Sequence, residues 1–196
     1  MALRPVHSFA AVVAGLVMCV AGFGEAAHAQ WVNGPPADED YFPIAVWLQR
    51  PEDAATWRAA GVNLYNGLWQ GPTTAQLDAL RAAGMQTIAT FNGVGEAYDQ
   101  TLPDGRPVIV GWLMQDEPDN AQPDGQGGYG PPVDPAVVQA KYNEWKTYDD
   151  TRPIFLNLGQ GIAWDNGTWY GQCGGITPDD DYPQYILGSD MISFDI

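Results

Sequence analysis

Histidine is absent from most of this sequence, because its two copies, His7 and His28, both lie in the first 28 residues. Beyond that point, no imidazole exists for Ser-His-Asp or Cys-His nucleophile activation, for zinc ligation by histidine, or for histidine-based proton shuttling. Carboxylates are therefore the remaining candidates for acid and base chemistry.

Basic residues are also scarce, with 8 lysines and arginines against 24 aspartates and glutamates and a net charge of -16. A nucleic-acid backbone or an anionic membrane surface would be repelled, so we expect no nucleic acid as a partner. All-oxygen metal sites are compatible with so acidic a chain, but the aspartates are scattered and lack the spacing of a calcium loop. We expect no metal and no other cofactor.

Long apolar runs are missing as well, since the longest, residues 9–20, is shorter than the roughly 20 residues that a membrane span needs. Arg4 precedes this run and Ala27-His28-Ala29 follows it, so residues 1–29 are typical of a secretory signal peptide. We expect a secreted protein, extracellular or periplasmic, without stable membrane insertion.

Cysteine occurs twice. Cys19 lies in the signal. Lipid-anchored cysteines normally follow a small residue, and Met18 stands there instead, so ordinary signal cleavage is favoured over a lipid anchor. Cys173 is alone after cleavage, so no internal disulfide can form in this chain, and a small buried side chain or a cysteine whose partner is absent is its expected role.

The remaining chain divides into a polar lead-in, residues 30–40, and one domain, residues 41–196. Strands and helices alternate in that domain, which predicts an α/β fold with a parallel sheet covered by helices. Alternation alone does not separate a barrel from an open sheet. We expect strands at 41–47, 62–66, 85–92, 108–115, 153–158 and 191–196, and helices at 51–61, 73–84 and 135–149.

Three connections differ from the rest. Residues 93–107 leave room for a short helix at most, whereas 118–132 and 159–182 are long Pro/Gly-rich loops that follow strand ends. Parallel α/β folds bind ligands at the carboxyl ends of their strands, so these two loops indicate where a site should lie.

The strand at 108–115 runs directly into Asp116, Glu117 and Pro118. Alternation predicts that Ile109, Gly111, Leu113, Gln115 and Glu117 share one face, which in a barrel points towards the axis. A carboxyl among apolar neighbours has a raised pKa and can donate a proton near neutral pH. The alternative is that Glu117 caps a helix or pairs with an arginine.

The sequence Gly111-Trp112-Leu113-Met114-Gln115-Asp116-Glu117-Pro118 resembles the strand-4 motif of the (β/α)8 retaining glycoside hydrolases. The resemblance extends over residues 41–196, and residues 190–196 are similar to the sixth strand of such barrels. It implies a (β/α)8 TIM-barrel type fold, here apparently truncated after about six strands. It also implies that Glu117 is the catalytic general acid/base, and that Asp116, which stands where the family usually has a sugar-binding Asn, contacts the substrate.

The family's nucleophile lies at the end of strand 7, and glycoside hydrolysis needs two carboxyl groups, about 5 Å apart in retaining enzymes. We therefore expect a secreted glycoside hydrolase-like protein that acts on or binds an oligo- or polysaccharide and is inactive as this fragment. One alternative is a non-catalytic carbohydrate-binding barrel, and another is an acidic, metal-dependent (β/α)8 enzyme. The oligomeric state is left open.

Aromatic and amide side chains at other strand ends and in the second long loop are suited to stack on sugar rings and to hydrogen-bond their hydroxyls. Asp195 is expected to orient a sugar hydroxyl or a loop, although it could supply a second carboxyl. Trp112, in the middle of a strand, is expected in the core. In addition to Asp116, the predicted substrate-binding residues are Trp47, Gln49, Asn66, Trp69, Asn92, Asn157, Trp164, Trp169 and Asp195.

Overall fold

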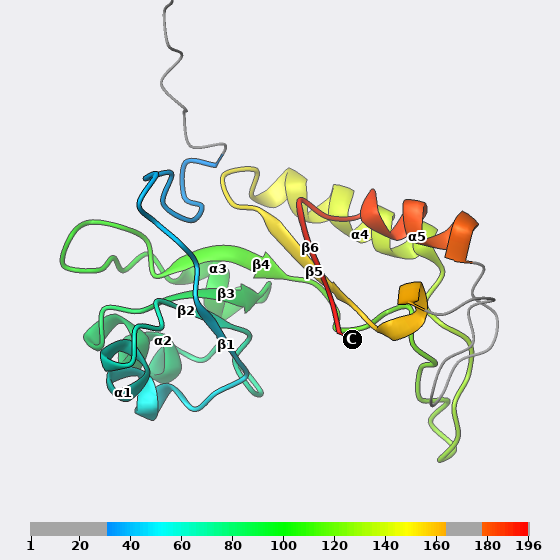
Figure 1. Cartoon of the computed structure of the whole chain (residues 1–196), viewed down its shortest axis with the longest axis horizontal. Helices are drawn as coiled ribbons and strands as arrows, with labels where there is room; N and C mark the ends of the chain where they lie inside the picture. The colour runs from blue at the N-terminus through cyan, green and yellow to red at the C-terminus, as the bar shows by residue number, and fades with distance from the viewer. Residues whose placement is uncertain (1–30, 164–177, 196) are drawn as a thin grey trace, which may run out of the picture.

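The computed structural model describes residues 31–163 and 178–195, and it contains one parallel sheet of six strands (Figure 1). Each strand pairs with the next one along the chain, in the order β1-β2-β3-β4-β5-β6. This confirms the predicted α/β fold with a parallel sheet. The strands are β1 (Ala45–Trp47), β2 (Leu64–Asn66), β3 (Gln86–Thr90), β4 (Ile109–Leu113), β5 (Ile154–Leu158) and β6 (Met191–Phe194).

Helices fill the connections between the strands. Figure 1 shows α4 and α5 side by side along β5 and β6. The helices are η1 (Pro51–Asp53), α1 (Ala54–Ala59), α2 (Thr74–Ala82), α3 (Gly93–Ala97), α4 (Pro135–Tyr148), η2 (Gln160–Ala163) and α5 (Pro178–Ile186). None of those in the described part of the chain is long and apolar enough to cross a membrane.

Local signals explain where several helices begin. Thr73 and Gln76 form the predicted capping box, in which the Thr73 hydroxyl accepts from the Gln76 N–H and the Gln76 side chain accepts from the Thr73 N–H. Asp134 caps α4 through the Ala136 N–H, directly before a proline at the first helical position. These ends lie within a residue or two of the predicted ones.

The two faces of the sheet pack differently. One face carries Tyr65, Trp112 and Leu156, which join the large apolar cluster that also contains residues of the helices. The other face carries a smaller cluster made only of strand residues, namely Leu64, Ile88, Val110, Leu113 and Phe155, with Met191 packed against it. Helices therefore cover one face, and the strands follow the chain order, as in half of a barrel rather than in a doubly wound sheet. Closure into an eight-stranded barrel stays a prediction.

Two expectations were wrong in detail. Ile109 does not share a face with Leu113, because the β3–β4 register shifts between Thr87 and Ile88; Ile109 packs with the helix-side cluster and Val110 with the strand-only cluster. The expected loop at 159–182 contains η2 and the start of α5. Pro183 inside α5 hid that helix, since proline in a helix interior usually ends it.

Candidate functional site

Asp116 and Glu117 lie just beyond the carboxyl end of β4, beside β5. The main chain stays attached to β5 after β4 ends, since the Met114 N–H donates to the Phe155 carbonyl and the Glu117 N–H to the Asn157 carbonyl, each at 2.9 Å. Glu117 has a φ of 41°, in the left-handed region that residues other than glycine rarely adopt. Its side chain is therefore placed by this turn and not by simple strand alternation.

Asn157, at the end of β5, links two of the predicted residues. Its Nδ2 donates to Asp116 Oδ1 at 2.9 Å, and its Oδ1 accepts from the hydroxyl of Ser193 on β6. The ends of β4, β5 and β6 are thus joined by one chain of side-chain hydrogen bonds. Asp116 itself is exposed, so it remains accessible to a ligand.

Glu117 is half-buried, and Asn120 Nδ2 donates to its Oε2 at 2.6 Å. Burial raises the pKa of the Glu117 carboxyl, and the negative charges of Asp116, Asp195 and Asp119 raise it further, while the Asn120 hydrogen bond opposes the rise. The carboxyl consequently keeps its proton to a higher pH than an ordinary glutamate. That is the property required of a general acid.

Asp119 is a buried carboxylate that sequence reasoning missed. It is fully buried and accepts hydrogen bonds from the Gly159 N–H, at 2.8 and 3.1 Å to its two oxygens, and from the Tyr182 hydroxyl at 2.7 Å. Burial raises its pKa despite these bonds, which lower it. Asp119 thereby ties the loop after β4 to the end of β5 and to α5, and holds the segment that carries Glu117.

A cavity of about 370 Å³ opens beside Asp116. Trp47 and Asp116 are the predicted residues that line it. Lys141 and Trp145 reach it from α4, with Lys141 Nζ 5.4 Å from the centre of the Trp145 ring. The sequence did not point to Lys141, because a single lysine on the polar face of a helix is not a functional signal. The full lining is Trp47, Leu48, Thr90, Phe91, Leu113, Met114, Gln115, Asp116, Lys141 and Trp145.

The other predicted residues within the described part of the chain, Glu117 among them, do not line this cavity. Gln49 Nε2 donates to the Trp47 carbonyl at 3.2 Å, and Trp69 is 66% exposed. Asn66 has a buried Oδ1 that has no hydrogen-bond partner within the described residues. Asp195 is exposed, and its backbone N–H donates to the Leu158 carbonyl.

Asn92 has a structural role in capping α3. Its Oδ1 accepts from the N–H groups of Val94 and Gly95, which caps α3, and its Nδ2 donates to the Pro72 carbonyl. Trp112 is only 2% exposed, as expected for a core residue. Trp164 and Trp169 lie outside the described residues, so their predicted role is untested. Across 31–163 and 178–195, no three metal-ligating side chains come together.

Comparisons with known proteins give no match to a protein-family model and none to a curated protein. Among solved structures, a glycosyl hydrolase family 2 member from Bacteroides cellulosilyticus DSM 14838 aligns at 14% identity and a TM-score of 0.44, covering 85% of this chain and 22% of its own. A second structure of such a member from Bacteroides cellulosilyticus aligns at 14% identity and a TM-score of 0.44, covering 76% and 20%. This chain thus spans about a fifth of the solved chains, and a likeness at that TM-score carries no argument about activity.

Proposed function

We propose that this protein is an exported, glycoside hydrolase-like protein whose carbohydrate site lies at the carboxyl ends of β1, β4, β5 and β6, with Glu117 as the general acid/base. The observation that carries the proposal is the Glu117 carboxyl, whose pKa is raised by burial and by three neighbouring carboxylates. A carboxyl with a raised pKa stays protonated to a higher pH and can then donate its proton to the oxygen of a leaving sugar.

The cavity beside Asp116, the residue before Glu117, suits a sugar, and Glu117 itself does not line it. Asp116 accepts from Asn157 through one oxygen, and within the described residues its other oxygen has no partner, so it can accept from a sugar hydroxyl. Trp47 is 37% exposed and lines the same cavity, so its ring is available to stack on the C–H face of a pyranose. The cavity combines a few placed polar groups with aromatic and aliphatic walls, which is typical of small-molecule sites.

Hydrolysis also needs a second carboxylate opposite the acid. Three carboxylates raise the Glu117 pKa, and we assign none of them as the second catalytic carboxylate. Asp119 is buried and links the loop after β4 to β5 and α5, Asp116 is hydrogen-bonded to Asn157, and Asp195 is assigned to orienting a hydroxyl or a loop. We therefore expect the 196-residue chain to bind carbohydrate without turning it over.

The test is a titration of the purified chain with a panel of neutral oligosaccharides, with binding measured by NMR and calorimetry. We expect at least one to bind, and Trp47→Ala to weaken that binding by about twofold to twelvefold, since a lost aromatic stack is worth about 0.5 to 1.5 kcal/mol. The control is Tyr129→Ala, because Tyr129 is an exposed aromatic residue that does not line the cavity and is not among the predicted substrate-binding residues.

Hydrolysis is assayed on the same samples. Binding without turnover is the expected result, whereas turnover that Glu117→Gln abolishes would support the acid role and refute our assignment of the second carboxylate. Failure of every oligosaccharide to bind, or equal effects of Trp47→Ala and Tyr129→Ala, would contradict the proposed site.

A further inference from the structure

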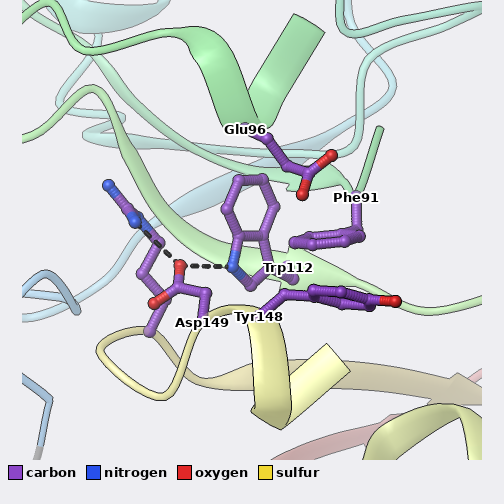
Figure 2. A pocket seen from close by; sticks show the side chains of 6 residues that line it. Phe91, Glu96, Trp112, Tyr148 and Asp149 are labelled. Carbon is purple, nitrogen blue, oxygen red and sulfur yellow. Dashed lines mark hydrogen bonds and ion pairs between the residues drawn. The ribbon is translucent and has the colours of Figure 1, made fainter. Parts of the chain in front are cut away.

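A second cavity, of about 320 Å³, lies between α3 and α4 on the helix-covered side of β4 (Figure 2). We infer that it is a binding site for a small organic cation of the alkylammonium class. Phe91 lines both cavities, but the residues that carry the carbohydrate proposal, Asp116, Glu117 and Trp47, do not line this one, so the two inferences are tested separately. Its lining residues are Phe91, Glu96, Trp112, Tyr148, Asp149 and Arg152.

Three aromatic side chains form the walls. Phe91 meets Trp112 edge to face, with ring centres 4.9 Å apart and planes at 89°, and stacks on Tyr148 at 6.0 Å and 23°. Figure 2 shows Tyr148 on one side of the Phe91 ring and the Glu96 carboxylate on the other. Phe91 also stacks on Trp145, with ring centres 5.0 Å apart and planes at 30°, and Trp112 is only 2% exposed. A ligand would therefore meet the part of the Phe91 ring that faces the cavity beside Glu96.

The Glu96 carboxylate at the top of this cavity differs from that of Asp149 in its contacts. Within the described residues, Glu96 forms neither a hydrogen bond nor an ion pair through its side chain, whereas Asp149 is occupied by Trp112 Nε1 at 2.7 Å, by Arg152 Nη1 at 2.8 Å and by the Thr151 hydroxyl. These bonds hold the Asp149 pKa below its ordinary value although burial opposes them, so this carboxylate is charged.

The charge balance of the lining selects a cation. Two carboxylates face one guanidinium, and Arg152 is already committed to Asp149 and, through Nε, to the Ile109 carbonyl at 2.8 Å. An anionic ligand would meet two carboxylates and a single guanidinium whose charge Asp149 already balances. A cation would gain the unpaired Glu96 carboxylate and an aromatic face together, the combination by which proteins recognise alkylammonium groups.

Arg152 shows that these aromatic walls accept positive charge, since its guanidinium carbon lies 5.4 Å from the centre of the Trp112 ring. The net charge of -16 adds a long-range attraction for a cation approaching the cavity. Tyr148 is 63% exposed, so the cavity is open to solvent beside it.

The test is NMR titration of the purified chain with choline, with 3,3-dimethylbutan-1-ol as its neutral isostere and glucose as a neutral polyol. We expect choline to shift the resonances of the cavity residues and the isostere to bind about threefold to tenfold more weakly, because it lacks the charge that Glu96 and the rings attract. Equal binding of choline and its isostere, or preferential binding of glucose, would overturn the inference.

Two variants localise the effect. Glu96→Gln removes the free carboxylate from an exposed position and should weaken choline binding about threefold to tenfold, whereas Glu144→Gln removes the same charge from an exposed position of α4 outside the lining and should leave it unchanged. Tyr148→Ala should also weaken binding, with Tyr129→Ala, another exposed tyrosine, as its control. If Glu96→Gln and Glu144→Gln behave alike, the attraction is that of net charge alone and the site is refuted.

Discussion

Glu117 is surrounded by negative charge, and this determines how readily its carboxyl releases a proton. Burial is the largest cause of its raised pKa, and the charge of Asp116 is the next. Asp116 is exposed and held by Asn157, so a change at Asp116 alters the charge beside Glu117 without opening the core.

The Asp116→Asn variant should lower the pKa of Glu117, because it removes a neighbouring negative charge that disfavours ionisation. The measurement is a carbon-13 NMR titration of the Glu117 carboxyl in both proteins. Asp99→Asn is the control, since Asp99 is exposed and is not among the groups that shift Glu117. A Glu117 midpoint that stays the same in Asp116→Asn would contradict this account.

The same shift affects stability. A pKa that is higher in the folded than in the unfolded chain means that folding favours the protonated carboxyl. The contribution of Glu117 is then complete below its unfolded pKa and is lost as the pH rises through its folded pKa. Glu117→Gln removes this pH dependence.

At this scale, the sequence was informative where a polar residue follows an apolar strand. The positions of Asp116, Glu117 and Asn157 at strand ends were predictable for that reason, and the structure brings the three residues together, while their roles stay predictions. Asp119 was not, because its burial depends on Gly159 and Tyr182, which are 40 and 63 residues further along the chain. Nothing local distinguishes it from the other aspartates of its loop.

The loops after β4 and β5 contact each other closely at Gly159. A Cβ added there would lie 2.8 Å from Asn120 Oδ1, closer than real contacts allow, and 3.0 Å from Asn120 Nδ2, which is a tight contact. The Asn120 amide would have to move, and it is the group that donates to Glu117. The packing of two loops is thus coupled to the ionisation of one carboxyl.

Gly159→Ala should therefore raise the pKa of Glu117 further, because the displaced Asn120 no longer donates the hydrogen bond that lowers it. It should also cost about 1 to 3 kcal/mol of unfolding free energy through overpacking. Both effects are measured by the carboxyl titration and by urea unfolding.

Two further variants test the cause. Gly93→Ala is the matched control, since a Cβ at Gly93 meets no atom within 4 Å. In an Asn120→Ala background, Gly159→Ala should have little further effect on the Glu117 pKa, because the group that it displaces is already gone. An unchanged Glu117 midpoint in Gly159→Ala alone would refute the coupling.

Elements with strong local signals were predictable, and those that depend on distant contacts were not. The capping box at Thr73 and the glycine after each of the first two helices gave boundaries close to the observed ones. The inward direction of β4 residues was mistaken at Ile109, since a register shift against β3 is set by the pairing of two strands. A single sequence pattern does not record that pairing.

For the whole molecule, the open edges of the sheet and the net charge act against each other. Among the described strands, β1 pairs only with β2 and β6 only with β5, so each outer edge leaves backbone groups unpaired. Phe42 and Ile44, just before β1, are 74% and 47% exposed. Such an edge favours association with another chain, whereas a net charge of -16 opposes it.

We accordingly expect the purified chain to associate reversibly, and to do so more strongly in about 300 mM than in about 20 mM sodium chloride, because salt screens the repulsion between acidic chains. Ile44→Lys should reduce this association, since a charged side chain at a strand edge disfavours pairing. Sedimentation velocity at several protein concentrations measures the effect, and circular dichroism checks that the fold is kept.

Val32→Lys is the control that distinguishes an effect of the β1 edge from the effects of removing an exposed apolar side chain and of adding a positive charge. Val32 is 85% exposed and lies in the lead-in rather than beside β1, so the substitution removes an exposed apolar side chain and adds the same charge away from the sheet edge. If the β1 edge drives association, Ile44→Lys weakens it and Val32→Lys has little effect. A chain that sediments as a monomer at high salt, or two variants with equal effects, would show that the edge is already protected.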